Sequence, residues 1–341
     1  MNIADTMTLQ SDLTINVSKF QPEAASDEVK NLNEYLMDTM KKDPKWYDVG
    51  AAKYRAMRAN GETVFPQPIV LDRGRNISMP SREHGRDIPC RVMTPESGVE
   101  AKAVFMHIHG GGFVLSSEKE FDTVLAKIAD LAHVVVVSVG YRLAPENSFP
   151  AGPEDCFDAA EWLIDNAKDE FGVELQFVGG ESAGGHLALS TYFHLTTSRP
   201  TFHFSGLVLN YGVFDLSFLP QVHHFQKRDT LFLDKEVMEH YRDAFCPGMS
   251  VEQLRHPSVS PFYHGLQGLR LPPAIFTCGT EDCLLDDTVM MAARWQIKGG
   301  TAVVRILPGA PHAYTLFPWD KCPEAKEGIE AGCAFVREMK K

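Results

Sequence analysis

The strongest chemical signal in the sequence is a serine held closely between glycines. Residues 180–184 read G-E-S-A-G, after the apolar run 175–178 and before a helix-like segment beginning near residue 187. A serine there can occupy a tight strand-to-helix turn, because small neighbours let the backbone pass close and the helix N-terminus favours developing negative charge. The pattern predicts that Ser182 is a nucleophile. Taken alone, in a chain with 26 glycines, it also fits a loop that merely caps a helix.

A second glycine cluster lies upstream and favours the chemical interpretation. Residues 109–113 read H-G-G-G-F and directly follow the apolar run 103–108. Attack of a serine on a carbonyl creates an oxyanion, which preorganised backbone N–H groups stabilise best, and glycine lets the backbone approach that oxygen without a Cβ in the way. Strand, glycine loop, strand and serine turn follow one another in the order that acyl transfer requires.

A serine hydroxyl also needs a histidine to take its proton and a carboxylate to orient that histidine. Asp282 follows the apolar run 273–278, and His312 follows the run 301–307. Both should therefore lie on loops at the carboxyl ends of strands, where α/β sheets place their sites. We assign Asp282 as the orienting carboxylate and His312 as the base.

Other residues compete for these roles. Asp286 and Asp287 are alternative acids, but acidic residues at that point are typical of the first turn of a helix. A cysteine nucleophile is the alternative to serine, yet none of the cysteines lies on a glycine-flanked turn, and the two beside the acid, Cys278 and Cys283, are expected to pack. The alternative bases are His107 in an apolar run, His186 one turn after the serine, and His223 and His224 in an irregular segment.

Together these motifs resemble the hormone-sensitive-lipase branch of the α/β-hydrolase esterases. Two further segments are similar to that branch: Y-R-L-A-P-E at 141–146, with F-P at 149–150 behind it, and D-C-L at 282–284. The resemblance covers residues from about 65 to 341. Glu181 stands where the branch usually has aspartate, and Cys283 where it usually has proline; neither change removes a reacting group.

The resemblance implies roles for the residues around the serine. The N–H groups of Gly111, Gly112 and Ala183 would form the oxyanion hole, and His109 and Gly110 would support the glycine loop. Glu181 would either hydrogen-bond near the acid or line the pocket.

The implied activity is that of a serine carboxylesterase acting on neutral esters of short to medium acyl chains through an acyl-enzyme. A pathway-specific deacetylase, a lactonase or an amidase would use the same machinery. Plant hormone receptors that resemble these esterases bind without hydrolysis and lack the histidine, whereas His312 is present here.

The composition of the chain restricts the kinds of molecule that it is expected to bind. The 341 residues carry a net charge of −12, which disfavours nucleic acid and anionic membranes and leaves a small-molecule ester as the expected substrate. No metal or cofactor is expected, because the sequence lacks H-E-x-x-H and a strand-linked G-x-G-x-x-G. The start Met1–Met7 has no secretory pattern, no long apolar stretch predicts membrane insertion, and the seven cysteines form no C-x-x-C pair, so we expect a cytoplasmic protein with free thiols. A homodimer is left open.

The elements that must position these residues follow an alternating pattern. Strands are expected near 69–77, 88–93, 103–109, 133–141, 174–179, 206–211, 273–278 and 302–307, with helical patterns at 118–131, 153–168, 183–196 and 286–298. This predicts an α/β-hydrolase fold with a mostly parallel eight-stranded sheet, helices on both faces and a helical cap. We expect N-terminal helices contributing to the cap (1–60), a first part of the catalytic core (61–213), a cap insertion (214–271) and a second part of the core (272–341).

Overall fold

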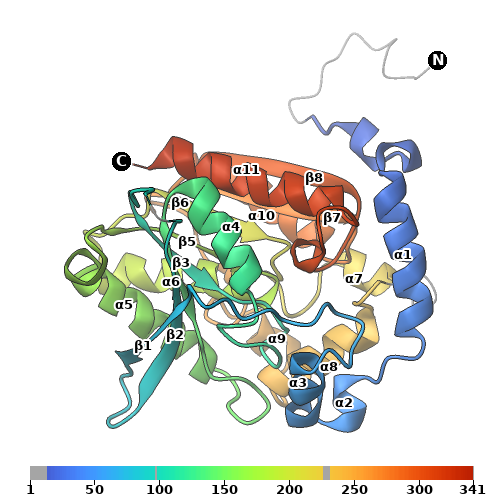
Figure 1. Cartoon of the computed structure of the whole chain (residues 1–341), viewed down its shortest axis with the longest axis horizontal. Helices are drawn as coiled ribbons and strands as arrows, with labels where there is room; N and C mark the ends of the chain where they lie inside the picture. Colours follow the sequence, from blue (N-terminus) through green and yellow to red (C-terminus); the bar gives the residue numbers. More distant parts are fainter. Residues whose placement is uncertain (1–13, 97, 226–230, 341) are drawn as a thin grey trace.

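The computed structural model describes residues 14–96, 98–225 and 231–340; the start Met1–Met7, used above to argue against a secretory signal, lies outside them. These residues form a twisted eight-stranded sheet at the centre of the molecule, in the order β1-β2-β4-β3-β5-β6-β7-β8 (Figure 1). The strands are β1 (Arg75–Pro80), β2 (Asp87–Met93), β3 (Val104–Ile108), β4 (Val135–Val139), β5 (Leu175–Glu181), β6 (Gly206–Asn210), β7 (Ala274–Glu281) and β8 (Ala302–Pro311).

The sheet is antiparallel only at one edge. β2 pairs antiparallel with both β1 and β4, and every other pair of neighbours is parallel. The predicted mostly parallel α/β-hydrolase sheet is confirmed. Because the carboxyl ends of β3, β5, β7 and β8 lie at the same edge, the loops that follow them can meet there.

Helices cover both faces of the sheet. The core helices are α4 (Asp122–Ala132), α5 (Ala151–Phe171), α6 (Ala183–Ser198), α10 (Leu285–Ile297) and α11 (Pro323–Met339). Side chains alternate across the strands: Val104 and Met106 of β3 pack into the larger apolar cluster with α5, α6 and α10, whereas Phe105 packs between α4 and α11. The inner strands β3 and β4 are buried along their whole length, as parallel strands covered on both faces must be.

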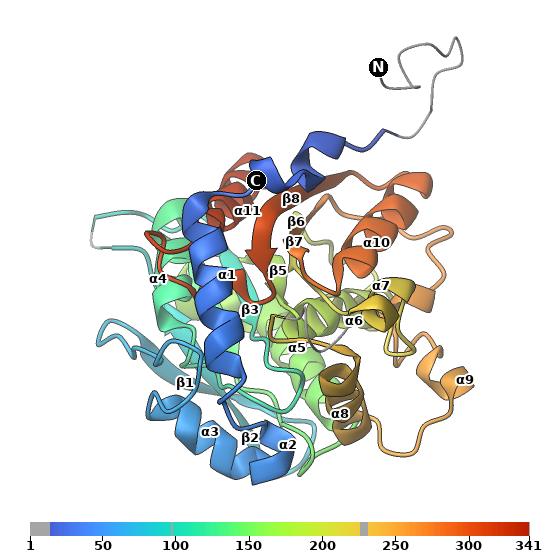
Figure 2. The same cartoon turned by 90° about the vertical axis from the view of Figure 1, so that its right-hand side faces the viewer.

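The remaining helices gather at the carboxyl-end edge of the sheet. They are α1 (Asp27–Met40), α2 (Trp46–Val49) and α3 (Ala51–Ala59) before the sheet, and α7 (Pro220–His224), α8 (Lys235–Phe245) and α9 (Val251–Leu254) after β6. α2 and α8 are joined by aromatic contacts: Trp46 stacks on Tyr241 with ring centroids 5.1 Å apart, and Tyr47 on His240 at 3.6 Å. Figure 2 shows α2, α3 and α8 along the same side of the molecule, so the segment before the sheet and the segment after β6 meet there.

Two expectations about elements need correction. A strand over 69–77 is wrong for its first part, because β1 begins only at Arg75. The preceding residues form a turn in which Gly74 N–H donates to the Leu71 carbonyl, while Leu71 N–H donates to Asp122. The apolar side chains Ile69 and Val70 are exposed and do not mark a buried strand. The sequence patterns also did not identify α11, whose buried face includes Ile329, Cys333 and Val336.

Candidate active site

Ser182 lies on a strained turn between β5 and α6. Its backbone angles are φ 56° and ψ −117°, a conformation that non-glycine residues adopt only where the surroundings impose it. The glycines on either side are required by space. A Cβ at Gly180 would lie 2.1 Å from the Ile108 carbonyl oxygen, and one at Gly184 would lie 1.9 Å from the same atom. The close approach of β3 thus explains the G-x-S-x-G spacing.

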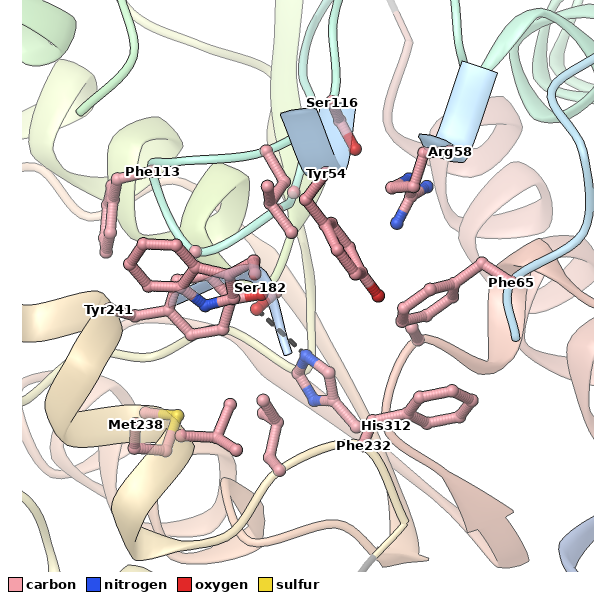
Figure 3. A pocket seen from close by; sticks show the side chains of 18 of the residues that line it. Tyr54, Arg58, Phe65, Phe113, Ser116, Ser182, Phe232, Met238, Tyr241 and His312 are labelled. Carbon is pink, nitrogen blue, oxygen red and sulfur yellow. Dashed lines mark hydrogen bonds between the residues drawn. The ribbon is translucent and has the colours of Figure 1, made fainter. Parts of the chain in front are cut away.

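The three residues assigned as nucleophile, base and acid are hydrogen-bonded in series. His312 Nε2 is 3.0 Å from Ser182 Oγ, and His312 Nδ1 is 2.8 Å from Asp282 Oδ2. This arrangement fits a neutral imidazole whose Nδ1–H donates to the carboxylate and whose Nε2 accepts from the serine hydroxyl. Figure 3 shows the Ser182–His312 contact facing the cavity.

The acid and its two rivals have different partners. Asp282 is fully buried, and its second oxygen accepts the Leu284 N–H at 2.9 Å. Asp287 instead accepts the backbone N–H groups of Phe214 and Asp215 at 2.6 and 3.0 Å, and Asp286 accepts that of Gln221 at 2.9 Å. Both rivals lie in the first turn of α10, as expected, and both bind the start of the 214–271 segment.

The glycine loop after β3 has the backbone conformation that its sequence suggests. Gly111 has φ +118° and Gly112 has φ +62°, and a Cβ at Gly111 would lie 2.2 Å from the Leu115 carbonyl oxygen. A Cβ at Gly112 would lie 2.2 Å from the ring of Tyr241 on α8. Ala183 is the first residue of α6, where backbone N–H groups have no partner within the helix. Gly111 and Gly112 line the cavity beside Ser182, and Ala183 directly follows Ser182 in the chain.

His109 is packed as a neutral side chain under this loop. Burial lowers the pKa of its imidazole to about 3, and Nδ1–H donates to the Gly110 carbonyl at 2.8 Å. The ring stacks on Tyr141 with centroids 4.3 Å apart, and the Tyr141 hydroxyl donates to the His109 carbonyl. These contacts hold the first residues of the glycine loop, His109 and Gly110, against Tyr141.

Glu181 lines the cavity, and its carboxylate contacts a second buried histidine. One oxygen is 2.8 Å from His107 Nε2, and His107 Nδ1 is 2.9 Å from Ser138 Oγ. The other oxygen is 3.5 Å from Asn210 Nδ2. The carboxylate thus bonds to His107 and Asn210, and Glu181 is also among the residues that line the cavity; its role in the reaction stays a prediction.

The remaining candidate nucleophiles and bases are either buried or, in the case of His223 and His224, exposed on a short helix. His186 is buried, its pKa is lowered to about 4 by that burial, and its ring is 2.8 Å from the Val213 carbonyl. His223 and His224 belong to α7. All seven cysteines are buried and unbridged, and burial raises the pKa of Cys278 and Cys283 well above the usual thiol range. Among the described residues, no group of three or more histidine, cysteine and acidic side chains is arranged to hold a metal ion.

A largely apolar cavity opens in front of Ser182. The sequence predicted the contribution of 214–271, which supplies Phe232, Leu233, Val237, Met238 and Tyr241. It also expected N-terminal helices in the cap but did not single out as lining residues Trp46, Tyr54, Arg58 and Phe65, which line the same cavity. No motif marks these residues: Trp46, Tyr54 and Arg58 lie in short helices with ordinary helical spacing, and Phe65 lies in the loop after α3.

Known proteins share this arrangement of elements. A family model described as alpha/beta hydrolase fold matches residues 105–316. Carboxylesterase NlhH of Mycobacterium tuberculosis is 31% identical over 255 residues, which are 74% of this chain and 78% of that protein. Ethyl acetate hydrolase of Pseudomonas putida is 29% identical over 70% of this chain and 74% of its own length. A hyperthermophilic esterase from Pyrobaculum calidifontis superposes with a TM-score of 0.71 at 29% identity, over 94% of this chain and 93% of its own. The chain thus belongs to the alpha/beta hydrolase fold family and is a carboxylic ester hydrolase.

Proposed function

We propose that this protein is a serine carboxylesterase in which Ser182, His312 and Asp282 form the catalytic triad. The observation that supports this most directly is the series of two hydrogen bonds, 3.0 and 2.8 Å long, that links the three side chains beside a cavity. The strained turn at Ser182 exposes the hydroxyl to the cavity, and Asp282 is buried, so its charge acts on the imidazole at low local dielectric.

The proposed reaction has two steps. His312 Nε2 takes the proton of Ser182 as Oγ attacks the ester carbonyl, and the resulting oxyanion is held by the N–H groups of Gly111, Gly112 and Ala183. The imidazolium then protonates the departing alcohol, leaving an acyl-enzyme. Water, deprotonated by the same histidine, attacks the acyl-enzyme; as the bond to Ser182 Oγ breaks, the imidazolium returns the proton to Oγ and the carboxylic acid is released. His109 and Gly110 support the glycine loop and Glu181 precedes Ser182, and none of the three exchanges a proton in either step.

The cap is part of the proposal. Residues 1–60 and 214–271 would cover the active site, and 61–213 with 272–341 would form the catalytic core. The stacked pairs Trp46–Tyr241 and Tyr47–His240 support this division, because they join the two cap segments. Tyr241 also contacts the glycine loop. A cap closed in this way would exclude water from the oxyanion.

The substrates proposed are neutral esters with short to medium acyl chains. The test is a kinetic series of p-nitrophenyl esters of increasing acyl length, run beside lactones and anilides. We expect kcat/KM for esters to rise with each added methylene until the cavity is full. Each methylene should lower the activation free energy by up to about 0.8 kcal/mol. A profile that is flat with acyl length would remove the role given to the cap. If kcat/KM were higher for anilides or lactones than for the esters, amide or lactone hydrolysis would be the main activity instead.

Two further points stand as proposals. In the described part of the chain, no helix combines the length and the apolar character needed to cross a membrane. A cytoplasmic location is proposed, because the seven cysteines are free thiols, as is usual in a reducing compartment. A homodimer is also proposed, through the first part of β8, the last strand in the sheet order, where Val303 and Val304 are exposed. Sedimentation of the full chain over a range of concentrations tests this assembly.

A further inference from the structure

The cavity contains a buried arginine that the reaction proposed above does not use. Arg58 lies in the last turn of α3, lines the cavity, and has a side chain only 6% exposed. Figure 3 shows its guanidinium reaching into the space between Tyr54 and Phe65. Removing a guanidinium from water is costly unless partners replace the lost hydrogen bonds, so its presence in this wall calls for an explanation.

The protein satisfies this guanidinium incompletely. Arg58 Nε lies 3.3 Å from Glu120 Oε2, yet each of these two buried atoms lacks a hydrogen-bond partner among the described residues. On the other side, the guanidinium carbon lies 4.6 Å from the centre of the Phe65 ring. A guanidinium carries five N–H donors, and one distorted ion pair and one ring face do not use them all. Donors are therefore available to a molecule in the cavity.

The neighbouring polar groups are already engaged. The Tyr54 hydroxyl donates to Asp43 at 3.0 Å, and Asp43 also accepts the Val64 N–H at 3.1 Å. Ser116 also lines the cavity, and its hydroxyl donates a hydrogen bond to Glu120. Among the apolar residues of this wall, Phe65 stacks on Phe232 with ring centroids 4.7 Å apart. Arg58 is thus a hydrogen-bond donor set in aromatic surroundings, an arrangement that discriminates well between molecules with and without an acceptor.

On this basis, and resting on the proposed esterase function, we propose that Arg58 determines specificity by donating hydrogen bonds to a neutral oxygen acceptor of the substrate, remote from the scissile ester. The acceptor is a ketone, ether or second ester oxygen. Two carboxylates, Glu120 and Asp43, already interact electrostatically with the one guanidinium. A carboxylate on the substrate would meet their repulsion, so a neutral acceptor fits this wall better.

The test compares esters that differ only in the acceptor. The acyl pair is p-nitrophenyl pentanoate and p-nitrophenyl 4-oxopentanoate. The alcohol pair is pentyl acetate and 4-oxopentyl acetate. Hydrolysis of all four esters is followed by the release of acid. For each pair, the ratio of kcat/KM with the ketone to kcat/KM without it is measured in the wild type and in Arg58→Met. We expect the ratio to fall at least about tenfold in the variant for one of the two pairs, mostly through KM.

Because both esters are hydrolysed by the same enzyme sample, the ratio is insensitive to the folded fraction. If Arg58→Met does not fold, the double variant Arg58→Met with Glu120→Gln removes the unpaired carboxylate and serves instead. Lys53→Met is the matched control: Lys53 lies on the same helix, its side chain is exposed, and its loss should leave both ratios unchanged.

The outcomes separate this inference from the proposed function. Ratios that stay within twofold of wild type in both pairs would overturn the role of Arg58 and leave the esterase standing. A higher kcat/KM for mono-p-nitrophenyl succinate than for the 4-oxopentanoate would overturn the neutral acceptor. Failure of the wild type to hydrolyse any of these esters would instead count against the proposed function itself.

Discussion

Replacing Gly111 by alanine tests whether the glycine loop acts as a donor of hydrogen bonds to the oxyanion. The new Cβ would lie 2.2 Å from the Leu115 carbonyl oxygen, in a turn closed by hydrogen bonds from Val114 N–H and Leu115 N–H to the Gly111 carbonyl. Because the obstacle is backbone, it cannot turn aside, and the loop itself must move. Losing one oxyanion donor costs about 3 kcal/mol, which corresponds to a fall in kcat of about 10²–10³.

The strain of an alanine at positive φ must be separated from this effect. Gly111 has φ +118°, and forcing such a conformation on alanine costs on the order of 1–3 kcal/mol of stability. Gly85→Ala is the matched control, because Gly85 has φ +82° and a Cβ at this position would meet nothing within 4 Å. We expect Gly85→Ala to lower the melting temperature without changing kcat. Stopped-flow or steady-state kcat with a saturating p-nitrophenyl ester, beside thermal melts, gives both quantities. A kcat for Gly111→Ala within tenfold of wild type would refute the donor role.

Four other changes have defined outcomes. Ser182→Ala should keep the fold and lower kcat by about 10³ or more, because covalent catalysis ends while the oxyanion donors remain; retention of a tenth of the activity would exclude Ser182 as nucleophile. Asp282→Asn should lower kcat strongly with little loss of stability, whereas Asp287→Asn should mainly lower the melting temperature, since Asp287 binds the N–H groups of Phe214 and Asp215; the reverse pattern would exchange the two assignments. The free energy of unfolding should fall as the pH drops from about 6 to 4, because the unfolded chain protonates His186 near pH 6.5 while burial holds its folded pKa at about 4. In His186→Asn, chemical denaturation should show this slope reduced by up to about 1.4 kcal/mol per pH unit, and an unchanged slope would contradict the assignment.

The sequence predicted the parts of the molecule that obey local rules. Seven of the expected strands overlap observed ones over most of their length, because β-branched runs such as 135–139 are apolar on both faces. Ser182, Asp282 and His312 could be placed together because each follows a strand whose carboxyl end lies at the same edge. The error at 69–74 arose from Ile69 and Val70, which are apolar yet exposed.

What the sequence could not give were contacts between distant segments. The hydrogen bond between Glu181 and His107 joins residues 74 positions apart in the chain, across β3 and β5, and depends on strand register. The position of Arg58 in the cavity wall likewise depends on how α3 packs against the glycine loop, which Arg55 fixes through the Val114 and Ala144 carbonyls. No periodicity within either segment carries that information.

The attachment of the 214–271 segment limits how this enzyme can be re-engineered. Its first backbone N–H groups bind Asp287, and a later one binds Asp286, five and four positions after Asp282 in the chain. A segment taken from another esterase therefore cannot be grafted at residue 214 as an independent cassette, because the graft must also satisfy two carboxylates beside the proposed acid. Chimeras that exchange 214–271 together with 282–288 preserve that junction, whereas chimeras that exchange 214–271 alone leave Asp287 buried without donors.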